Sequence, residues 1–223
     1  WFVENGFLYL YPPTGMDINN SKVIANTLSY VIDEATTVSN ITINGIDFFA
    51  TSVRFGATNT SNIKFYDSQF TYIGAEHLLI DRIHAETANR PVTVNGTNIE
   101  FEKCLFAGAQ NSALQLIGGQ LKVKNCVFME NNRHANFQSR ALVIKPSSAY
   151  QVTQNTFFNN CSDAIMVNPK KYDDTIKPEV SYNNIFNAGL YNSDVSGIYL
   201  PILSQEYTDV HHNWLHNVNG NAV

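Results

Sequence analysis

One eight-residue pattern recurs seven times along the chain and constrains its fold more than any other feature. Each copy has an apolar residue at its third position and another five residues later, as in LKVKNCVF at Leu121–Phe128. The third positions are Ile43, Phe65, Phe101, Val123, Val152, Val180 and Val210, and the later positions are Phe48, Phe70, Phe106, Phe128, Phe157, Ile185 and Leu215. Seven copies with both positions filled indicate an internal repeat.

The spacing of the copies predicts the architecture. Successive third positions are separated by 22, 36, 22, 29, 28 and 30 residues. The shortest spacing occurs twice and is too short for a helix pair or a propeller blade, so the longer spacings are interpreted as the same unit with an inserted loop. A unit of this length fits a solenoid of stacked coils, in which equivalent strands pair at ~4.8 Å.

A third apolar stretch completes each coil. Its expected inward residues, which alternate with outward ones as in any strand, are Leu78, Leu114, Leu142, Ile165 and Ile198. In the first of these stretches, His77–Asp81 is the expected third strand, and the insertion 82–96 follows it. We therefore predict an all-β, right-handed, single-stranded parallel β-helix of about seven to nine coils, each with three short strands.

The two ends of the chain differ from the repeats. Residues 1–37 are expected to form an N-terminal lead-in or cap segment with the first strands, because an open stack exposes unpaired backbone groups. Residues 38–223 are expected to form the β-helix. The chain begins at Trp1 and stops at Val223 just as a third strand begins, so we interpret it as truncated and as part of a longer, exported protein with further domains.

One inward position predicts two side-chain ladders. It holds Cys104, Cys126, Asn155, Asn183 and Asn213 in successive coils. The cysteines are expected to stack as reduced thiols, because parallel Cβ vectors suit a disulfide poorly. The asparagines are expected to hydrogen-bond along the stack.

Outward positions of the first strand carry charges in register. Lys64, Glu100 and Lys122 follow one another, and Glu102 is followed by Lys124, which predicts ion pairs between coils. The complementary pattern stops further along, where the outward residues are Glu179, Ser181, Asp209 and His211.

Composition excludes several function classes. The formal net charge of −5 and the scattered basic residues argue against a nucleic-acid partner. No apolar run is long enough to span a bilayer. The Cys and His spacing matches no zinc site, so no cofactor is expected, apart from Ca²⁺ if the protein is a lyase.

Reactive side chains gather at the carboxyl end. The candidate catalytic residues are Asp194, Glu206, Asp209, His211 and His212, and the candidate sugar-binding residues are Tyr191, Tyr199 and Trp214. Carboxylates supply the acid and base of glycoside hydrolysis, and a lyase needs a base such as His. A second cluster consists of Glu130, Arg133, His134 and Arg140, with Lys145 and Lys170 nearby. Its positive charge would suit a carboxylated or sulfated sugar.

The repeats also carry a family resemblance. VTQNTF at Val152–Phe157, with Asn159 and Asn160 after it, resembles the right-handed parallel β-helix superfamily, which includes pectate-lyase-like enzymes and many glycoside hydrolases; NNIFNAG at Asn183–Gly189 and VHHNWLHN at Val210–Asn217 are similar to its later coils. The polygalacturonase set of NTD, DD, GHG and RIK motifs is absent, and so is a clear pectate-lyase calcium set. The resemblance therefore implies the fold, and it transfers no catalytic residue.

The leading hypothesis is a secreted or cell-surface enzyme, a glycoside hydrolase or polysaccharide lyase that cleaves a plant or algal polysaccharide in a groove along the β-helix. The alternative is a non-catalytic carbohydrate-binding or adhesin-type β-helix module. A trimeric, phage-type tail fibre is a third interpretation, supported by the apolar outward residues of the third strand, such as Val143 and Met166.

Overall fold

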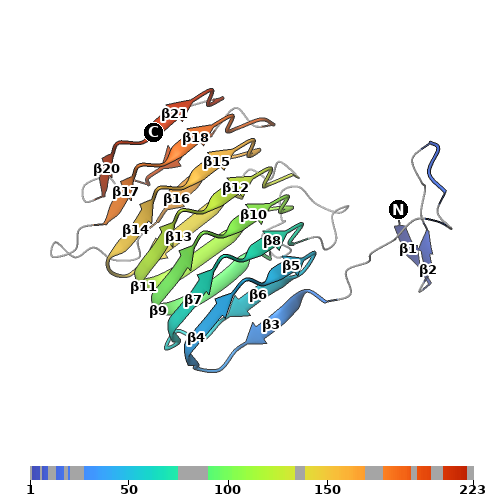
Figure 1. Cartoon of the computed structure of the whole chain (residues 1–223), viewed down its shortest axis with the longest axis horizontal. Helices are drawn as coiled ribbons and strands as arrows, with labels where there is room; N and C mark the ends of the chain where they lie inside the picture. Colours follow the sequence, from blue (N-terminus) through green and yellow to red (C-terminus); the bar gives the residue numbers. More distant parts are fainter. Residues whose placement is uncertain are drawn as a thin grey trace.

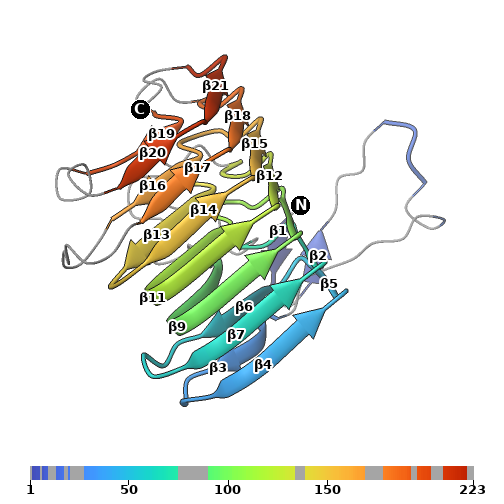
Figure 2. The same ribbon diagram turned by 60° about the vertical axis from the view of Figure 1, so that its left-hand side comes forward.

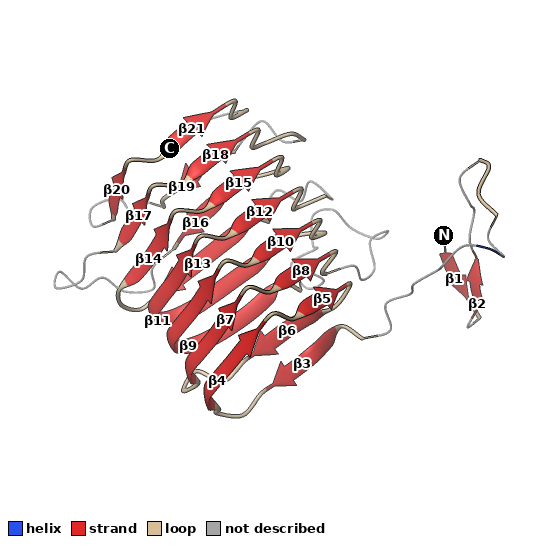
Figure 3. Cartoon of the chain, in the orientation of Figure 1, coloured by secondary structure: helices blue, strands red, loops and turns tan. Residues whose placement is uncertain are grey.

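The computed structural model describes residues 2–5, 7–9, 14–17, 20, 28–74, 90–133, 139–168, 178–191, 195–201 and 208–219. These residues form 21 strands and no α-helix, and the strands of the main body stack as successive coils (Figure 1). The body is built of strands joined by corners and loops (Figure 3). Every strand pairing within it is parallel, so the described chain is a parallel β-helix.

One side of the β-helix is a seven-stranded sheet made by the second strand of each coil. Its strands are β5 (Asp47–Phe49), β8 (Gln69–Thr71), β10 (Leu105–Ala107), β12 (Val127–Met129), β15 (Thr156–Phe158), β18 (Asn184–Phe186) and β21 (Trp214–His216). We call its outward surface the second face.

The first and third strands of the coils share a twelve-stranded sheet. The first strands, whose outward surface is the first face, are β4 (Ser39–Asn44), β7 (Ser61–Tyr66), the second halves of β9 (Val92–Glu102) and β11 (Leu114–Lys124), β14 (Tyr150–Thr153), β17 (Glu179–Ser181) and β20 (Asp209–His211). The third strands, whose outward surface is the third face, are β3 (Tyr30–Glu34), β6 (Ser52–Phe55), the first halves of β9 and β11, β13 (Leu142–Pro146), β16 (Ile165–Val167) and β19 (Ile198–Tyr199).

The core is a column of inward side chains, as the repeat predicts. Val123 pairs in register with Phe101 on one side and Val152 on the other, and all three are fully buried. Phe106 and Phe128 are also fully buried, and their rings stack with centroids 4.7 Å apart. The predicted fold class and register are therefore confirmed.

The corner between the first and second strands always contains a residue in the left-handed region. These residues are Gly45, Asp67, Lys103, Asn125, Gln154, Tyr182 and His212. The left-handed residue turns the chain, so that the next side chain points into the core. This inward position is the one that forms the ladders.

The asparagine ladder is confirmed. Asn155 Nδ2 donates to the carbonyl of Val123 and to Asn183 Oδ1, both at 3.0 Å, while Asn155 Oδ1 accepts from the Cys126 backbone N–H at 2.9 Å. Asn183 repeats the arrangement with Asn213. Each side chain therefore satisfies backbone groups that the corner leaves unpaired.

The cysteine ladder is also confirmed. Cys104 and Cys126 are free and buried, and the Cys104 backbone N–H points at Cys126 Sγ, 3.4 Å away. Burial raises the pKa of the Cys126 thiol well above its usual value, which keeps it protonated at neutral pH.

Replacing Asn155 by alanine is expected to lower the free energy of unfolding by about 2–3 kcal/mol, because the Cys126 N–H and the Val123 carbonyl lose their buried partner. Urea unfolding followed by circular dichroism measures the change. Asn44→Ala, at an exposed outward position of β4, is the control and is expected to change the stability by less than about 0.5 kcal/mol. Equal effects of the two substitutions would contradict a stabilising ladder.

Two sequence predictions need correction. Val92–Gly96, the first half of β9, pairs with both β6 and β11 and occupies the position predicted for His77–Asp81, which lies outside the described residues. The first long insertion therefore follows the second strand, not the third. The connections β8–β9, β12–β13 and β18–β19 thus all run from a second strand to a third strand, at one edge of the third face. The connections β16–β17 and β19–β20 run from a third strand to a first strand, at its other edge.

The predicted ion-pair ladder forms only at its start. Lys64 Nζ lies 3.6 Å from Glu100 Oε2, and the Tyr66 hydroxyl donates to the same oxygen at 3.1 Å. Lys122 is in register with Glu100, but the described residues contain no ion pair between them, because Glu100 is already engaged on its other side. Lys124 and its register partner Glu102 also form no ion pair in the described residues.

The segment 1–37 contains an antiparallel hairpin, β1 (Phe2–Glu4) with β2 (Phe7–Tyr9), and the strand β3, which pairs with β6 in the stack. In the described residues no strand pairing joins the hairpin to the β-helix. Its role as a cap therefore stays a prediction.

Candidate functional site

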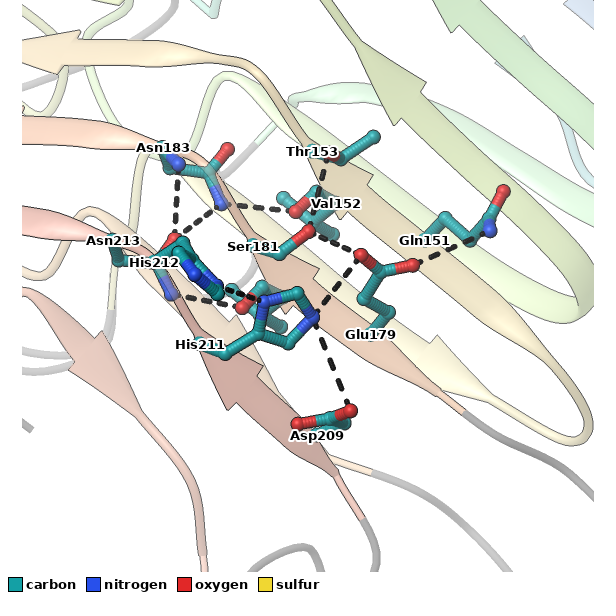
Figure 4. Close-up of polar contacts among 11 residues, drawn as sticks. Gln151, Val152, Thr153, Glu179, Ser181, Asn183, Asp209, His211, His212 and Asn213 are labelled. Atoms are coloured by element: carbon teal, nitrogen blue, oxygen red, sulfur yellow. Dashed lines mark hydrogen bonds and ion pairs between the residues drawn. The ribbon is translucent and has the colours of Figure 1, made fainter.

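Polar side chains converge on the first face at its carboxyl end, where β14, β17 and β20 pair in parallel (Figure 4). One outward row holds Gln151, Glu179 and Asp209, and the neighbouring row holds Thr153, Ser181 and His211. We call these residues, together with His212, the Glu–His cluster. The register of the coils brings them together, since the two rows come from three separate segments of the chain.

The Glu179 carboxylate contacts three other side chains of the cluster. Its Oε1 accepts a hydrogen bond from the Ser181 hydroxyl, its Oε2 accepts one from Gln151 Nε2 at 3.5 Å, and Oε1 also lies 3.4 Å from His211 Nε2. Both carboxylate oxygens are therefore occupied. Glu179 is placed to orient the His211 ring and to stabilise positive charge on it.

His211 links the carboxylates to a second imidazole. Its Nε2 faces Glu179 and, at 3.9 Å, Asp209 Oδ2, while its Nδ1 lies 2.7 Å from His212 Nδ1. Two carboxylates beside Nε2 favour the tautomer with its proton there, so Nδ1 accepts the proton that His212 Nδ1 donates. The lone pair of His212 is then on Nε2, on an exposed side chain.

The corner that follows β20 holds the His212 ring in place. His212 has φ 53°, and the equivalent residue one coil away, Tyr182, has φ 55°. Their rings stack with centroids 4.9 Å apart and an interplanar angle of 17°. His212 therefore packs against both Tyr182 and His211, whose rings also contact each other, and its Nε2 can face solvent or a ligand.

The structure places the predicted catalytic residues Asp209, His211 and His212 together. It places two predicted sugar-binding residues elsewhere: Trp214, which is 66% exposed, is on the second face, and Tyr199, which is 41% exposed, is on the third face. The expected single cluster is thus divided between three surfaces. Neighbours in sequence lie on different faces because each coil turns three corners.

The remaining predicted residues lie further away or outside the described part of the chain. Tyr191 is exposed in the turn after β18, and the Arg133 guanidinium lies 6.0 Å from the centre of the Tyr72 ring. Asp194, Glu206 and His134 lie outside the described residues. Their predicted roles remain predictions.

Sequence reasoning missed the role of Glu179, Ser181 and Gln151. The available signal was the end of the complementary charge pattern on the first face, which falls at β17. The repeat predicts that Glu179 and Ser181 lie beside Asp209 and His211, and the register of β17 with β20 confirms it. The sequence does not show that Glu179 turns towards His211 in the neighbouring row, because this depends on side-chain conformation.

Neither a group of metal-ligating side chains nor a membrane-spanning helix is found among the described residues. No group of three or more His, Cys, Asp or Glu side chains is arranged there to hold a metal ion. A search of the same residues for a helix with the length and hydropathy to cross a membrane also finds none. Ca²⁺ binding stays a prediction.

Comparison with known protein families identifies the family of this chain. A family described as "Right handed beta helix region" matches residues 6–173 and, in a second overlapping match, residues 86–223. The chain belongs to this family. Comparison with curated proteins and with solved structures gives no significant match. For this right-handed β-helix protein, the family match fits the parallel stack and gives its hand, and the chemistry has to be argued from the Glu–His cluster.

Proposed function

We propose that this β-helix protein is a secreted carbohydrate-active enzyme that cleaves a polysaccharide, with His212 Nε2 as the catalytic base. The observation that carries the proposal is the chain of contacts from Glu179 through His211 to His212. A histidine held by a carboxylate through its other ring nitrogen is a common arrangement for a general base. Here a second imidazole extends that arrangement to the protein surface.

The proton transfers follow from the tautomers. His212 Nε2 takes a proton from the substrate, and the proton on His212 Nδ1 moves across the 2.7 Å contact to His211 Nδ1. His211 is then an imidazolium whose Nε2–H faces Glu179 and Asp209. The positive charge therefore develops beside two carboxylates, and Coulomb attraction stabilises it.

A sugar substrate is supported by the aromatic side chains around the first corner. Tyr182, which stacks on His212, and Trp214, on the adjoining second face, expose 54% and 66% of their surfaces. Large exposed aromatic rings beside polar groups are typical of ligand sites and suit the C–H faces of sugars. Because a polysaccharide substrate lies outside the cell, we propose a secreted or cell-surface location.

Elimination is favoured over hydrolysis as the reaction. Hydrolysis by the two-carboxylate mechanism needs one free acid and one free base or nucleophile. Glu179 is occupied by its neighbours, so Asp209, whose side chain is 71% exposed, is the free carboxylate of the cluster within the described residues. In an elimination, His212 Nε2 takes the proton from the carbon beside the uronate carboxylate, and the C–O bond to the leaving sugar breaks as the C=C bond forms. The same proton on His212 Nε2 can then pass to the leaving oxygen, so no second acid is needed.

Alanine at His212 or His211 is expected to lower kcat by about 10²–10⁴-fold on a polysaccharide panel, the usual contribution of a general base. His216→Ala is the matched control for kcat, because His216 is in the same coil but packs on Phe186 and Trp214 on the second face, away from His211 and His212. Glu179→Gln keeps the side-chain shape and removes its charge, and it is expected to lower kcat with little change in KM. Equal turnover by all four variants and the wild type would overturn the proposal.

The products separate the alternatives. A lyase produces unsaturated ends that absorb in the near ultraviolet, whereas a hydrolase produces reducing ends without this absorbance. A hydrolase would assign the chemistry to Asp209 together with Asp194 or Glu206. Retention of glycan on immobilised protein without any product would instead favour a non-catalytic binding or adhesin-type module.

A further inference from the structure

A second polar group lies on the third face, away from the Glu–His cluster. Strands β13, β16 and β19 lie side by side there (Figure 2), and their outward side chains Val143, Met166 and Tyr199 are in register. Arg140 comes two residues before β13, at the edge of this face. We call Arg140, Asp163 and Tyr199 the arginine site.

The guanidinium of Arg140 is held in one orientation by a buried carboxylate. Arg140 Nε donates to Asp163 Oδ2 at 2.8 Å, and the two side chains are only 14% and 6% exposed. The other Asp163 oxygen accepts from the Ser196 backbone N–H at 2.6 Å. Burying an ion pair costs desolvation energy, so such pairs contribute little net stability. The pair instead fixes the position of the Arg140 guanidinium.

Most N–H donors of the Arg140 side chain have no acceptor in the described part of the chain. A guanidinium has five N–H groups, and only Nε–H is engaged with Asp163. Within the described part of the chain, the two terminal nitrogens make no hydrogen bond, and neither is among the fully buried unpaired atoms. The two terminal nitrogens are therefore not sealed from solvent, and the fork they form matches the two oxygens of a carboxylate.

An aromatic ring lies beside the Arg140 guanidinium. The Arg140 guanidinium carbon lies 5.8 Å from the centre of the Tyr199 ring, which is 41% exposed. The charge of Arg140 is balanced by that of Asp163, so the unused N–H donors of Arg140 are what favour an anion here.

We propose that the arginine site binds an acidic sugar, with its carboxylate on the terminal nitrogens of Arg140 and its ring against Tyr199. The site lies on a different face from the Glu–His cluster, so it stands whether or not that cluster is catalytic. It would anchor a uronate-bearing glycan to the third face, along which successive coils repeat at ~4.8 Å.

The chain contains a matched comparison at the other end of the same face. Arg54 also pairs with an aspartate one coil away and lies over a tyrosine, with its guanidinium carbon 4.6 Å from the Tyr30 ring centre. Its Nε and one terminal nitrogen both bind Asp33, at 2.6 and 2.8 Å. Because this pair is bidentate, one terminal nitrogen of Arg54 is already engaged, whereas both terminal nitrogens of Arg140 are free of the aspartate.

The test measures the Kd of trigalacturonate by isothermal titration calorimetry, in wild type and in a His212→Ala background that prevents cleavage. Arg140→Lys and Tyr199→Ala are expected to weaken binding about tenfold or more, the size of a lost charge-assisted hydrogen bond. Arg54→Lys is expected to leave the Kd within about twofold. The methyl ester of the trisaccharide is expected not to bind, because it lacks the carboxylates.

Several results would overturn the arginine site. Unchanged affinity in both Arg140→Lys and Tyr199→Ala would do so, and so would equal binding of the methyl ester. Loss of binding in His212→Ala alone would move the ligand to the first face. Tyr199→Ala removes a partly exposed ring and leaves the Arg140–Asp163 pair intact, so it tests the site even if Arg140→Lys disturbs folding.

Discussion

Replacing Gly118 by alanine is expected to lower the free energy of unfolding by more than about 4 kcal/mol, among the largest effects of a single substitution. A Cβ atom at this position would lie 1.8 Å from the carbonyl oxygen of Gly96 and 2.8 Å from its carbonyl carbon. Both are backbone atoms of the neighbouring coil and cannot rotate away. Gly118 also has φ +126°, a conformation that residues with a Cβ rarely adopt.

The position explains why this glycine matters to the fold. Gly96 and Gly118 pair in register at the point where β9 and β11 pass from the third face to the first as continuous strands. Gly56→Ala is the control, because its Cβ would meet its nearest neighbour, the Glu34 carbonyl oxygen, at an ordinary 3.7 Å. Urea unfolding of both variants measures the difference, and a Gly118→Ala loss below about 1 kcal/mol would contradict the close approach.

Phe128→Ala is expected to cost about 3–5 kcal/mol of folding free energy, the range for removing a buried aromatic ring. Phe128 is fully buried, and its ring stacks between Phe106 at 4.7 Å and Phe157 at 4.6 Å. The alanine leaves a cavity in the middle of the stack, which the flanking rings, fixed by their own strands, cannot close. Thermal and urea unfolding give the loss directly.

Phe49 provides the control for this substitution. It belongs to the same seven-stranded sheet, but its side chain points outward and is 50% exposed. Phe49→Ala is expected to cost less than about 1 kcal/mol, because little apolar surface leaves water at this site. If Phe128→Ala were tolerated equally well, the inward aromatic column would not be what stabilises the coils.

The fold could be predicted from the sequence because its main signal is local and repeated. Val123, Val152 and Val180 each occupy the same position in a similar phrase, and any parallel stacking that buries one of them buries all three. The ladder of Asn155 and Asn183 follows from the same register. Where the repeat pattern was weaker, the prediction failed. His77–Asp81 was predicted as a third strand, but the first half of β9 occupies that position in the stack.

The Glu–His cluster was only partly predictable. Asp209, His211 and His212 are adjacent in sequence and could be singled out by residue type. The repeat also placed Glu179 in the coil beside them, but it could not show that the carboxylate turns towards His211 in the neighbouring row. The site also depends on side-chain geometry, such as the 2.7 Å contact between the two Nδ1 atoms, which no spacing encodes.

The sequence by itself determined the coil: its length, its three inward columns, and the ladder at the first corner. It could do so because burial of apolar side chains constrains every repeat in the same way. Only the tertiary structure decided which outward side chains meet, and it separated Tyr199 and Trp214 while joining Glu179 to His211 and Arg140 to Asp163. Outward contacts depend on hydrogen bonds between particular pairs of coils, and those bonds leave no periodic trace in the chain.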